Sequence, residues 1–197
     1  MVDNIFESIK SFLPHYLNPP QISALLNDLR SFPEGQNYFF EGPVSDWLQG
    51  DCWNGFVLIN FDSGNRQEVS GVIISNSCDI DLKNDSMLPR YVLFSPLVSL
   101  AKILAFLCEN EISEEKQRNF VDAVKKQRVF QIIYFPPKPG VVDESLIFLD
   151  QIYSQPLLHF KRNPKSKLFS LNDYGFYLFL LKLSIHFTRI DEKVSRS

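Results

Sequence analysis

Residues 68–97 read EVSGVIISNSCDIDLKNDSMLPRYVLFSPL. Two apolar runs, 69–74 and 91–94, flank a polar segment over 75–89. Short runs that are rich in β-branched residues and bounded by Asn, Ser, Asp and Pro are typical of strands joined by a loop. A loop held between two rigid strands is a common place for binding or catalytic residues. We therefore predict that residues 75–89 are the first place to look for a functional site.

The composition fits one globular domain, with or without an appendage. The chain has 197 residues, of which 45% are hydrophobic and 22% are charged, as in ordinary globular proteins. Eighteen Phe residues predict a core built on large rings. The net charge of −3 argues against a protein that coats nucleic acid non-specifically. A local basic groove remains compatible with it, and the most basic part is the last third of the chain.

Cysteine usage and the apolar stretches indicate a cytoplasmic protein. The three cysteines lack CxxC spacing, so we expect neither a disulfide framework nor a zinc site of the usual cysteine spacing. Free thiols fit a reducing compartment. The acidic N-terminus lacks the apolar core of a signal peptide. The longest apolar stretch, 91–108, contains Pro96 and Lys102, which argues against a membrane span. Nothing in these patterns calls for a cofactor.

Residues 1–46 are predicted to form a helical N-terminal extension. Apolar residues recur at helical spacing over 5–13 and again over 22–29, which predicts two amphipathic helices. Residues 33–46 contain two Gly and two Pro and are predicted to be a loop or linker. The extension is either a helical lid on the main domain or a docking arm for a partner.

Residues 47–190 are predicted to form a mainly β domain with added helices. Strands are expected over 50–61, 69–74, 91–94, 129–135, 146–153 and 157–160, with a hairpin turn at 62–65. A buried helix is expected over 98–107, a charged helix over 110–128 and a long aromatic helix over 171–189. This order predicts a small β-barrel closed off by a C-terminal helix, of the α+β class, with a helical insertion near 98–128. Residues 191–197 are predicted to be a tail.

Four segments of this domain follow the order of motifs in a known family. Gly50-Asp51 before an apolar strand is similar to an opening G-D-[IV]. VSGVIISN over 69–76 is similar to R-P-x-x-V-[LI]-S-N, and VLFSPLVS over 92–99 to V-x-P-[IL]-T-S. ESLIFLDQIY over 144–153 is similar to S-x-[VL]-x-x-D-Q-[IV]. With the closing helix, this order resembles the PemK/MazF toxin family, whose members are small Src-homology-type β-barrels.

The resemblance implies a fold more firmly than an activity. Active members cut single-stranded RNA without a metal, using the arginine of the R-P motif and a serine or threonine near the start of the third strand. Here those positions hold Ser70-Gly71 and Arg90, so neither catalytic residue is carried over. The resemblance implies binding to RNA, or to an antitoxin-like or defence protein partner, in a bacterial toxin–antitoxin or phage-defence setting. Family members commonly dimerise, so a homodimer is also expected.

Two alternatives stay open beside binding without cleavage. The chain is either an active metal-independent endoribonuclease with a relocated site, or a structural interaction module. For a relocated site, Arg66 and Arg90 are the catalytic candidates, because a guanidinium stabilises a phosphorane-like transition state. Arg66, Arg90 and Lys161 are the nucleic-acid-binding candidates. Asp79 is a third catalytic candidate, which either orients an arginine or caps the loop through backbone hydrogen bonds.

The other chemically interesting residues have structural interpretations. The acidic neighbours of Cys78 oppose a thiolate, so we predict a small buried residue at a strand end. His159, in the strand expected over 157–160, is predicted to be structural or solvated. Trp47 and Trp53 are predicted to be core or interface residues rather than base-stacking platforms.

A metal site is not predicted in the polar segment. Asp79, Asp81 and Asp85 lie close together in sequence. They lack the glycine and the closing glutamate of a calcium loop.

Overall fold

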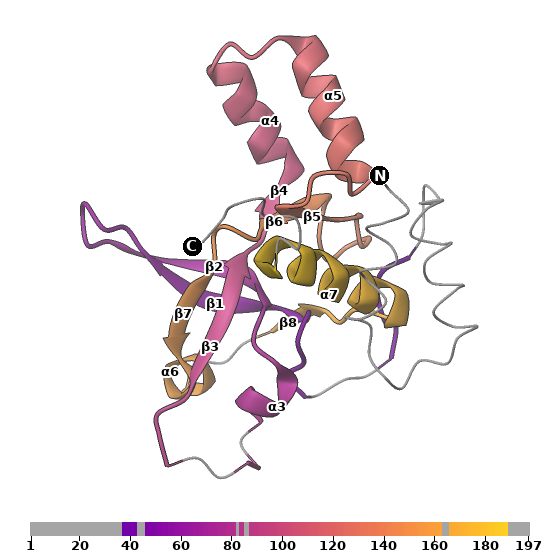
Figure 1. Cartoon of the computed structure of the whole chain (residues 1–197). Helices are drawn as coiled ribbons and strands as arrows, with labels where there is room; N and C mark the ends of the chain where they lie inside the picture. Colours follow the sequence, from indigo (N-terminus) through magenta and orange to yellow (C-terminus); the bar gives the residue numbers. More distant parts are fainter. Residues whose placement is uncertain (1–36, 43–45, 82, 85–86, 163–165, 189–197) are drawn as a thin grey trace, which may run out of the picture.

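The two apolar runs of residues 68–97 form neighbouring strands in the computed structural model of the chain (Figure 1). Strand β2 (Arg66–Ile73) pairs antiparallel with β3 (Tyr91–Pro96), and Ile73 lies opposite Phe94. The structure describes residues 37–42, 46–81, 83–84, 87–162 and 166–188. The predicted strand pair is confirmed, and the polar segment follows β2 directly.

A five-stranded antiparallel sheet contains this pair. Its order is β7-β3-β2-β1-β8, with β1 at Cys52–Ile59, β7 at Tyr153–Pro156 and β8 at Lys167–Phe169. The predicted hairpin between β1 and β2 is confirmed. In its turn, the Asn60 side chain accepts hydrogen bonds from the backbone N–H groups of Asp62 and Ser63, as turn-forming Asn side chains do.

A second, three-stranded sheet has the order β4-β6-β5. These strands are β4 (Val98–Ser99), β6 (Ser145–Phe148) and β5 (Ile132–Phe135). The chain crosses from one sheet to the other at Leu97, since β3 ends at Pro96 and β4 begins at Val98. The described strands therefore form two antiparallel sheets with helices rather than one closed barrel. The mixed α+β class with much β structure is confirmed.

The core beneath the larger sheet is a stack of three phenylalanine rings. The Phe56 ring lies 4.1 Å from that of Phe94 and 4.4 Å from that of Phe160, between centroids, with interplanar angles of 13° and 11°. A Cβ atom at Gly71 would lie 2.8 Å from the rings of both Phe56 and Phe94. Glycine is therefore the residue that lets β2 pass the stack. The phenylalanine stack agrees with the prediction that large rings build the core.

Helix α7 (Asp173–Thr188) covers the rest of the core. It begins at Asn172, whose side-chain oxygen accepts a hydrogen bond from the Gly175 N–H at 2.9 Å. Its Leu178 and Phe179 are buried. The predicted C-terminal helix is confirmed. In the described part of the chain, no helix combines the length and apolar character needed to cross a membrane.

The described part of the predicted linker, residues 37–42, is packed against α7. Tyr38 and Phe39 are buried, and Phe39 forms an isolated antiparallel bridge with Leu171. A Cβ atom at Gly175 would lie 2.6 Å from the Tyr38 carbonyl oxygen, which shows how closely the segment approaches the helix. The two helices predicted over 5–13 and 22–29, and the tail over 191–197, lie outside the described residues.

The predicted insertion is a helical hairpin that projects away from the sheets (Figure 1). Its helices are α4 (Leu100–Glu109) and α5 (Glu114–Lys125). The prediction that α4 is buried is wrong, because Leu100 is its one buried residue and Phe106 is 60% exposed. Hydrophobic periodicity in a sequence indicates that a helix has an apolar face, but it does not indicate whether another element covers that face.

A buried lysine attaches α7 to the base of the hairpin. Lys182 is 3% exposed, and its Nζ donates to the Gln127 side-chain oxygen at 2.8 Å, to the Gln127 carbonyl oxygen at 3.2 Å and to the Ile132 carbonyl oxygen. Gln127 has a φ of 54° and also bonds both backbone polar groups of Tyr134. Burial lowers the pKa of Lys182 to about 7.

Two predicted strands differ from the structure. The strand expected over 146–153 is divided into β6 and β7 by a turn, in which the Gln151 N–H donates to the Phe148 carbonyl oxygen. The strand expected over 157–160 is helix α6 (Leu157–Arg162). Leu157 and Phe160 are its buried residues, and their spacing of three places them on one face of a helix, whereas in a strand they would point to opposite faces. Strand β8 was not predicted.

Candidate functional site

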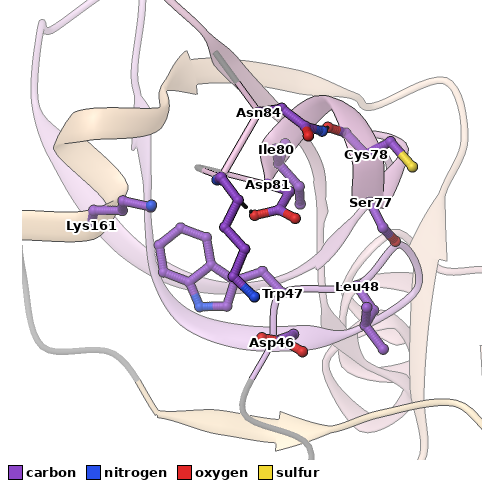
Figure 2. A pocket seen from close by; sticks show the side chains of 10 residues that line it. Asp46, Trp47, Leu48, Ser77, Cys78, Ile80, Asp81, Asn84 and Lys161 are labelled. Atoms are coloured by element: carbon purple, nitrogen blue, oxygen red, sulfur yellow. Dashed lines mark hydrogen bonds between the residues drawn. The ribbon is translucent and has the colours of Figure 1, made fainter. Parts of the chain in front are cut away.

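An open pocket of about 500 Å³ lies at the end of the larger sheet (Figure 2). It is enclosed by the segment before β1, by the short helix α3 (Ser77–Ile80) with the residues after it, and by α6. The predicted polar loop thus supplies one wall of the pocket. The lining residues are Asp46, Trp47, Leu48, Ser77, Cys78, Ile80, Asp81, Lys83, Asn84 and Lys161.

The α3 wall is held in place by short polar side chains at the end of β2. The Asn76 side chain caps α3 by accepting a hydrogen bond from the Cys78 N–H at 2.9 Å. The Ser77 hydroxyl accepts from the Gln49 N–H at 2.8 Å, and the Gln49 side chain donates to the Ile74 carbonyl oxygen. These bonds join the α3 wall to the segment before β1, so the two walls form one unit.

The wall formed by the segment before β1 is anchored by an ion pair between a buried aspartate and a half-buried lysine. Asp51 is 1% exposed, its Oδ2 lies 2.7 Å from Lys167 Nζ, and the same oxygen accepts from the Leu48 N–H at 3.0 Å. Lys167 also donates to the Asp46 carbonyl oxygen at 2.8 Å. Gly50 permits the turn with a φ of 86°, and its N–H donates to the Ile73 carbonyl oxygen. Gly50-Asp51 is therefore a structural anchor of the pocket.

Trp47 and Lys161 meet across the pocket. Figure 2 shows the Lys161 ammonium pointing from α6 toward the indole, and Nζ lies 5.0 Å from the centroid of the Trp47 ring. This is cation–π geometry. The Trp47 ring also makes edge contacts with Trp53 and Phe160. Both tryptophans were predicted to be core or interface residues. Trp53 is in the core, with 8% of its surface exposed, whereas Trp47 is half-buried and lines the pocket.

Arg90 lies beside this pair and connects two walls of the pocket. Its guanidinium donates to the Asp81 carbonyl oxygen after α3, and its own carbonyl oxygen accepts from the Leu157 N–H at the start of α6. Partial burial lowers the pKa of Lys161, nearby Arg90 lowers it further, and Asp81 opposes the shift. Two of the three predicted nucleic-acid-binding residues, Arg90 and Lys161, are thus brought together.

Arg66 lies at the opposite end of β2. It begins the strand opposite Ile59, whereas Ile73 ends the strand next to Gly50. A strand rises about 3.3 Å per residue, so the length of β2 alone separates Arg66 from the pocket by roughly 23 Å. Of the three nucleic-acid-binding candidates, Arg66 therefore does not lie near Arg90 and Lys161.

Asp79 and Cys78 differ from their predicted structural roles. Asp79 is exposed and does not line the pocket. The capping expected of it is performed by Asn76, and by Asp81, whose Oδ1 accepts from the Lys83 N–H at 2.9 Å. Cys78 is exposed at the pocket rim rather than buried. Both differences follow from α3, since one helical turn after β2 points these side chains outward.

The remaining candidate residues do not contribute a catalytic or metal-binding group to the pocket. His159 is on α6 rather than on a strand, and its side chain is exposed. In the part of the chain that the structure describes, no group of three or more His, Cys, Asp or Glu residues could hold a metal ion. Asp85 lies outside that part.

The positions that the family pattern assigns to catalysis have structural partners. The Ser70 hydroxyl donates to the Asn54 side-chain oxygen at 2.7 Å, and Asn54 in turn donates to the Ser166 hydroxyl. Gly71 lies against the phenylalanine stack. Sequence reasoning did not foresee the roles of Trp47, Asp81 and Asn84 in the pocket. The signal that could have found Trp47 is its position three residues before Gly50, at the start of the Gly50-Asp51 turn.

No family model matches the sequence, and a search of curated proteins gives no match. A function therefore has to be argued from the geometry of the pocket.

Proposed function

We propose that this protein is a diverged PemK/MazF-like protein that binds single-stranded RNA in the pocket, in a bacterial toxin–antitoxin or phage-defence setting, without the cleavage typical of that family. The observation that carries the proposal is the Lys161 ammonium over the Trp47 ring in an open pocket, with Arg90 close enough to Lys161 to lower its pKa. The order of β1, β2, β3, the second sheet and the terminal helix α7 supports the family part of the proposal.

The pocket contains the two features that a single-stranded nucleic acid requires. Cationic side chains attract the phosphate, and an aromatic ring stacks with a base regardless of its sequence. Without a ligand, the Lys161 ammonium lies over the Trp47 ring. When RNA arrives, the ammonium turns to a phosphate and the ring face becomes available to a base. The volume of about 500 Å³ falls within the ~300–1,000 Å³ of small-ligand sites, so the pocket admits a base and its phosphate rather than a duplex.

The absence of family-type cleavage is proposed from the two catalytic positions. Ser70 replaces the arginine and is bonded to Asn54, while Gly71 replaces the proline and abuts two rings. Arg66 is at the far end of β2. Of the two arginines considered as catalytic candidates, Arg90 is the one near the pocket, and it already donates to a backbone carbonyl oxygen. The alternative, a metal-independent endoribonuclease with a relocated site, would have to use Arg90.

Fluorescence anisotropy of a labelled ten-nucleotide oligouridylate, titrated with the full chain at 50 to 200 mM KCl and in EDTA, tests the proposal. We expect Lys161→Ala to weaken binding and to reduce the slope of log K against log salt by about 0.7, the value for one phosphate contact on a single strand. Arg66→Ala is the matched control, since it removes a cation outside the pocket and should leave both quantities unchanged.

Three results would overturn the proposal. Wild-type protein that binds no RNA at 50 mM KCl excludes an RNA site. Equal effects of Lys161→Ala and Arg66→Ala exclude this pocket as the site. Shortening of the RNA on a denaturing gel in EDTA, lost in Arg90→Ala, would show the endoribonuclease alternative instead.

A further inference from the structure

Helix α4 lies in the hairpin, at the end of the molecule opposite α3 (Figure 1), and one of its sides is apolar and exposed. Leu100, Ile103 and Leu104 face the cluster that joins the hairpin to the smaller sheet. Phe106 is 60% exposed. Its exposed neighbours on α4 include three small residues, Ala101, Ala105 and Cys108. Exposed apolar surface of this kind on a projecting element is typical of interaction sites.

The neighbouring helix α5 shows what a solvated helix looks like in the same hairpin. Its outer side carries ion pairs one turn apart, Glu114 with Arg118 at 3.2 Å and Asp122 with Lys126 at 2.5 Å. Helix α4 has no such pair among the described residues. Its two charged residues, Lys102 and Glu109, are both exposed.

Lys102 and Glu109 are spaced for pairing with a second copy of the same helix. They are seven residues apart, which is close to two helical turns, so they lie on the same side of α4. Their midpoint falls between Ala105 and Phe106. If two α4 helices cross antiparallel about a two-fold axis at that midpoint, each Lys102 meets the partner's Glu109. A parallel arrangement would instead place like charges together.

We propose that the protein forms a symmetric dimer in which α4 packs antiparallel against α4 of a second copy. Such an interface is isologous, so the same surface serves both subunits. Ala105 at the axis allows the helices to approach closely, and Phe106 covers the partner's small residues. The two Lys102–Glu109 contacts set the register.

The size of the surface sets the expected strength of the dimer. A ten-residue helix is roughly 15 Å long, so one helix pair buries less than the ~800 Å² per subunit of a standard stable interface. We therefore expect reversible association that rises with protein concentration. Because the exposed ion pairs are screened by salt, the dimer should weaken as ionic strength increases.

Sedimentation velocity of the full chain over a concentration series tests this interface. We expect Lys102→Glu and Glu109→Lys each to shift the protein toward monomer, because each variant brings like charges together twice in the dimer. The double variant K102E/E109K restores the opposite charges and should recover the wild-type dissociation constant within about 3-fold. Lys116→Glu is the matched control, since it makes the same charge change on the exposed side of α5.

The charge-reversal set leaves no ambiguous outcome. All three positions are exposed, so the variants should fold, which circular dichroism checks. A wild-type chain that stays monomeric to several hundred micromolar overturns the proposal. So does a dimer that Lys102→Glu leaves intact, because the interface then lies elsewhere. A double variant that remains as monomeric as the single variants excludes this antiparallel register, and a different partner would then occupy the face.

Discussion

The pocket end and the hairpin end of the molecule each contain a lysine that is bonded to other protein groups, half-buried at the pocket end and buried at the hairpin end, and the two lysines have different partners. Lys167, near the pocket, is 2.7 Å from the buried carboxylate of Asp51. Lys182, at the base of the hairpin, donates to neutral oxygens of Gln127 and Ile132. A neighbouring carboxylate offsets the cost of burying the charge, and neutral acceptors do so only in part. The same residue type thus pairs with a carboxylate at one end, and at the other it is bonded to neutral oxygens while burial lowers its pKa.

Removing the carboxylate at the pocket end should have the largest effect. Asp51→Ala removes the counter-charge of the half-buried Lys167 and the acceptor of the Leu48 N–H. Breaking a fully buried pair costs about 3–5 kcal/mol, and we expect a loss near the lower end of this range because water reaches part of Lys167. Urea unfolding at pH 7 measures the loss. Asp51→Asn, which keeps an acceptor for Leu48, should lose less than Asp51→Ala, and an equal loss in both variants would contradict the role of the hydrogen bond.

At the hairpin end, stability should depend on pH through Lys182. Its folded-state pKa of about 7 lies below the ordinary value of 10.5. Between these pH values the unfolded chain binds a proton that the folded chain does not. The free energy of unfolding therefore rises with pH over this range, by at most about 1.4 kcal/mol per pH unit from this group.

The comparison of wild type with Lys182→Met isolates that contribution. Urea unfolding at pH 7, 8 and 9 should give a smaller increase in stability for Lys182→Met than for wild type, whatever the absolute stability of the variant. Lys116→Met removes an exposed lysine and should keep the wild-type slope. Parallel curves for wild type and Lys182→Met would show that Lys182 keeps its charge throughout.

The smallest effect concerns the cap of α3. Asn76→Ala removes the bond to the Cys78 N–H and should cost about 1 kcal/mol. Asp79→Ala, three residues later, removes an exposed side chain and should stay within about 0.5 kcal/mol of wild type. Thermal unfolding of the two variants side by side measures both. A larger loss for Asp79→Ala would restore the capping role first predicted for that residue.

Local patterns predicted the elements that are stabilised locally. The turn signal at 62–65 correctly predicted the hairpin of β1 and β2, and the charged pattern after Ser113 correctly predicted α5. Short apolar runs were ambiguous, so α6 was predicted as a strand. The three residues of β8 form a strand because they pair with β1, which a local pattern cannot reveal.

The sequence predicted where the pocket lies, but it did not predict most of the residues that form it. The polar segment after β2 does line it, because Asn76 and Ser77 fold that segment against the end of the sheet. Arg66 was expected there because it is near the segment in sequence, but a strand carries it to the far end. The pairing of Asp51 with Lys167 links distant parts of the chain, and neither residue has a neighbour in sequence that signals it.

The pairing of β1 with β8 determines when the pocket can form during synthesis. Cys52 lies opposite Phe169, and Asp51 has its ion-pair partner only after Lys167 has been synthesised. At about 5–20 residues per second, translation of the intervening chain takes on the order of ten seconds. Throughout that interval one edge of β1 has no strand beside it, and the nascent chain carries an open β edge of the kind that chaperones protect. The residues that line the pocket all precede β8, so a chain truncated before β8 would keep them and lose the Lys167 partner that anchors Asp51.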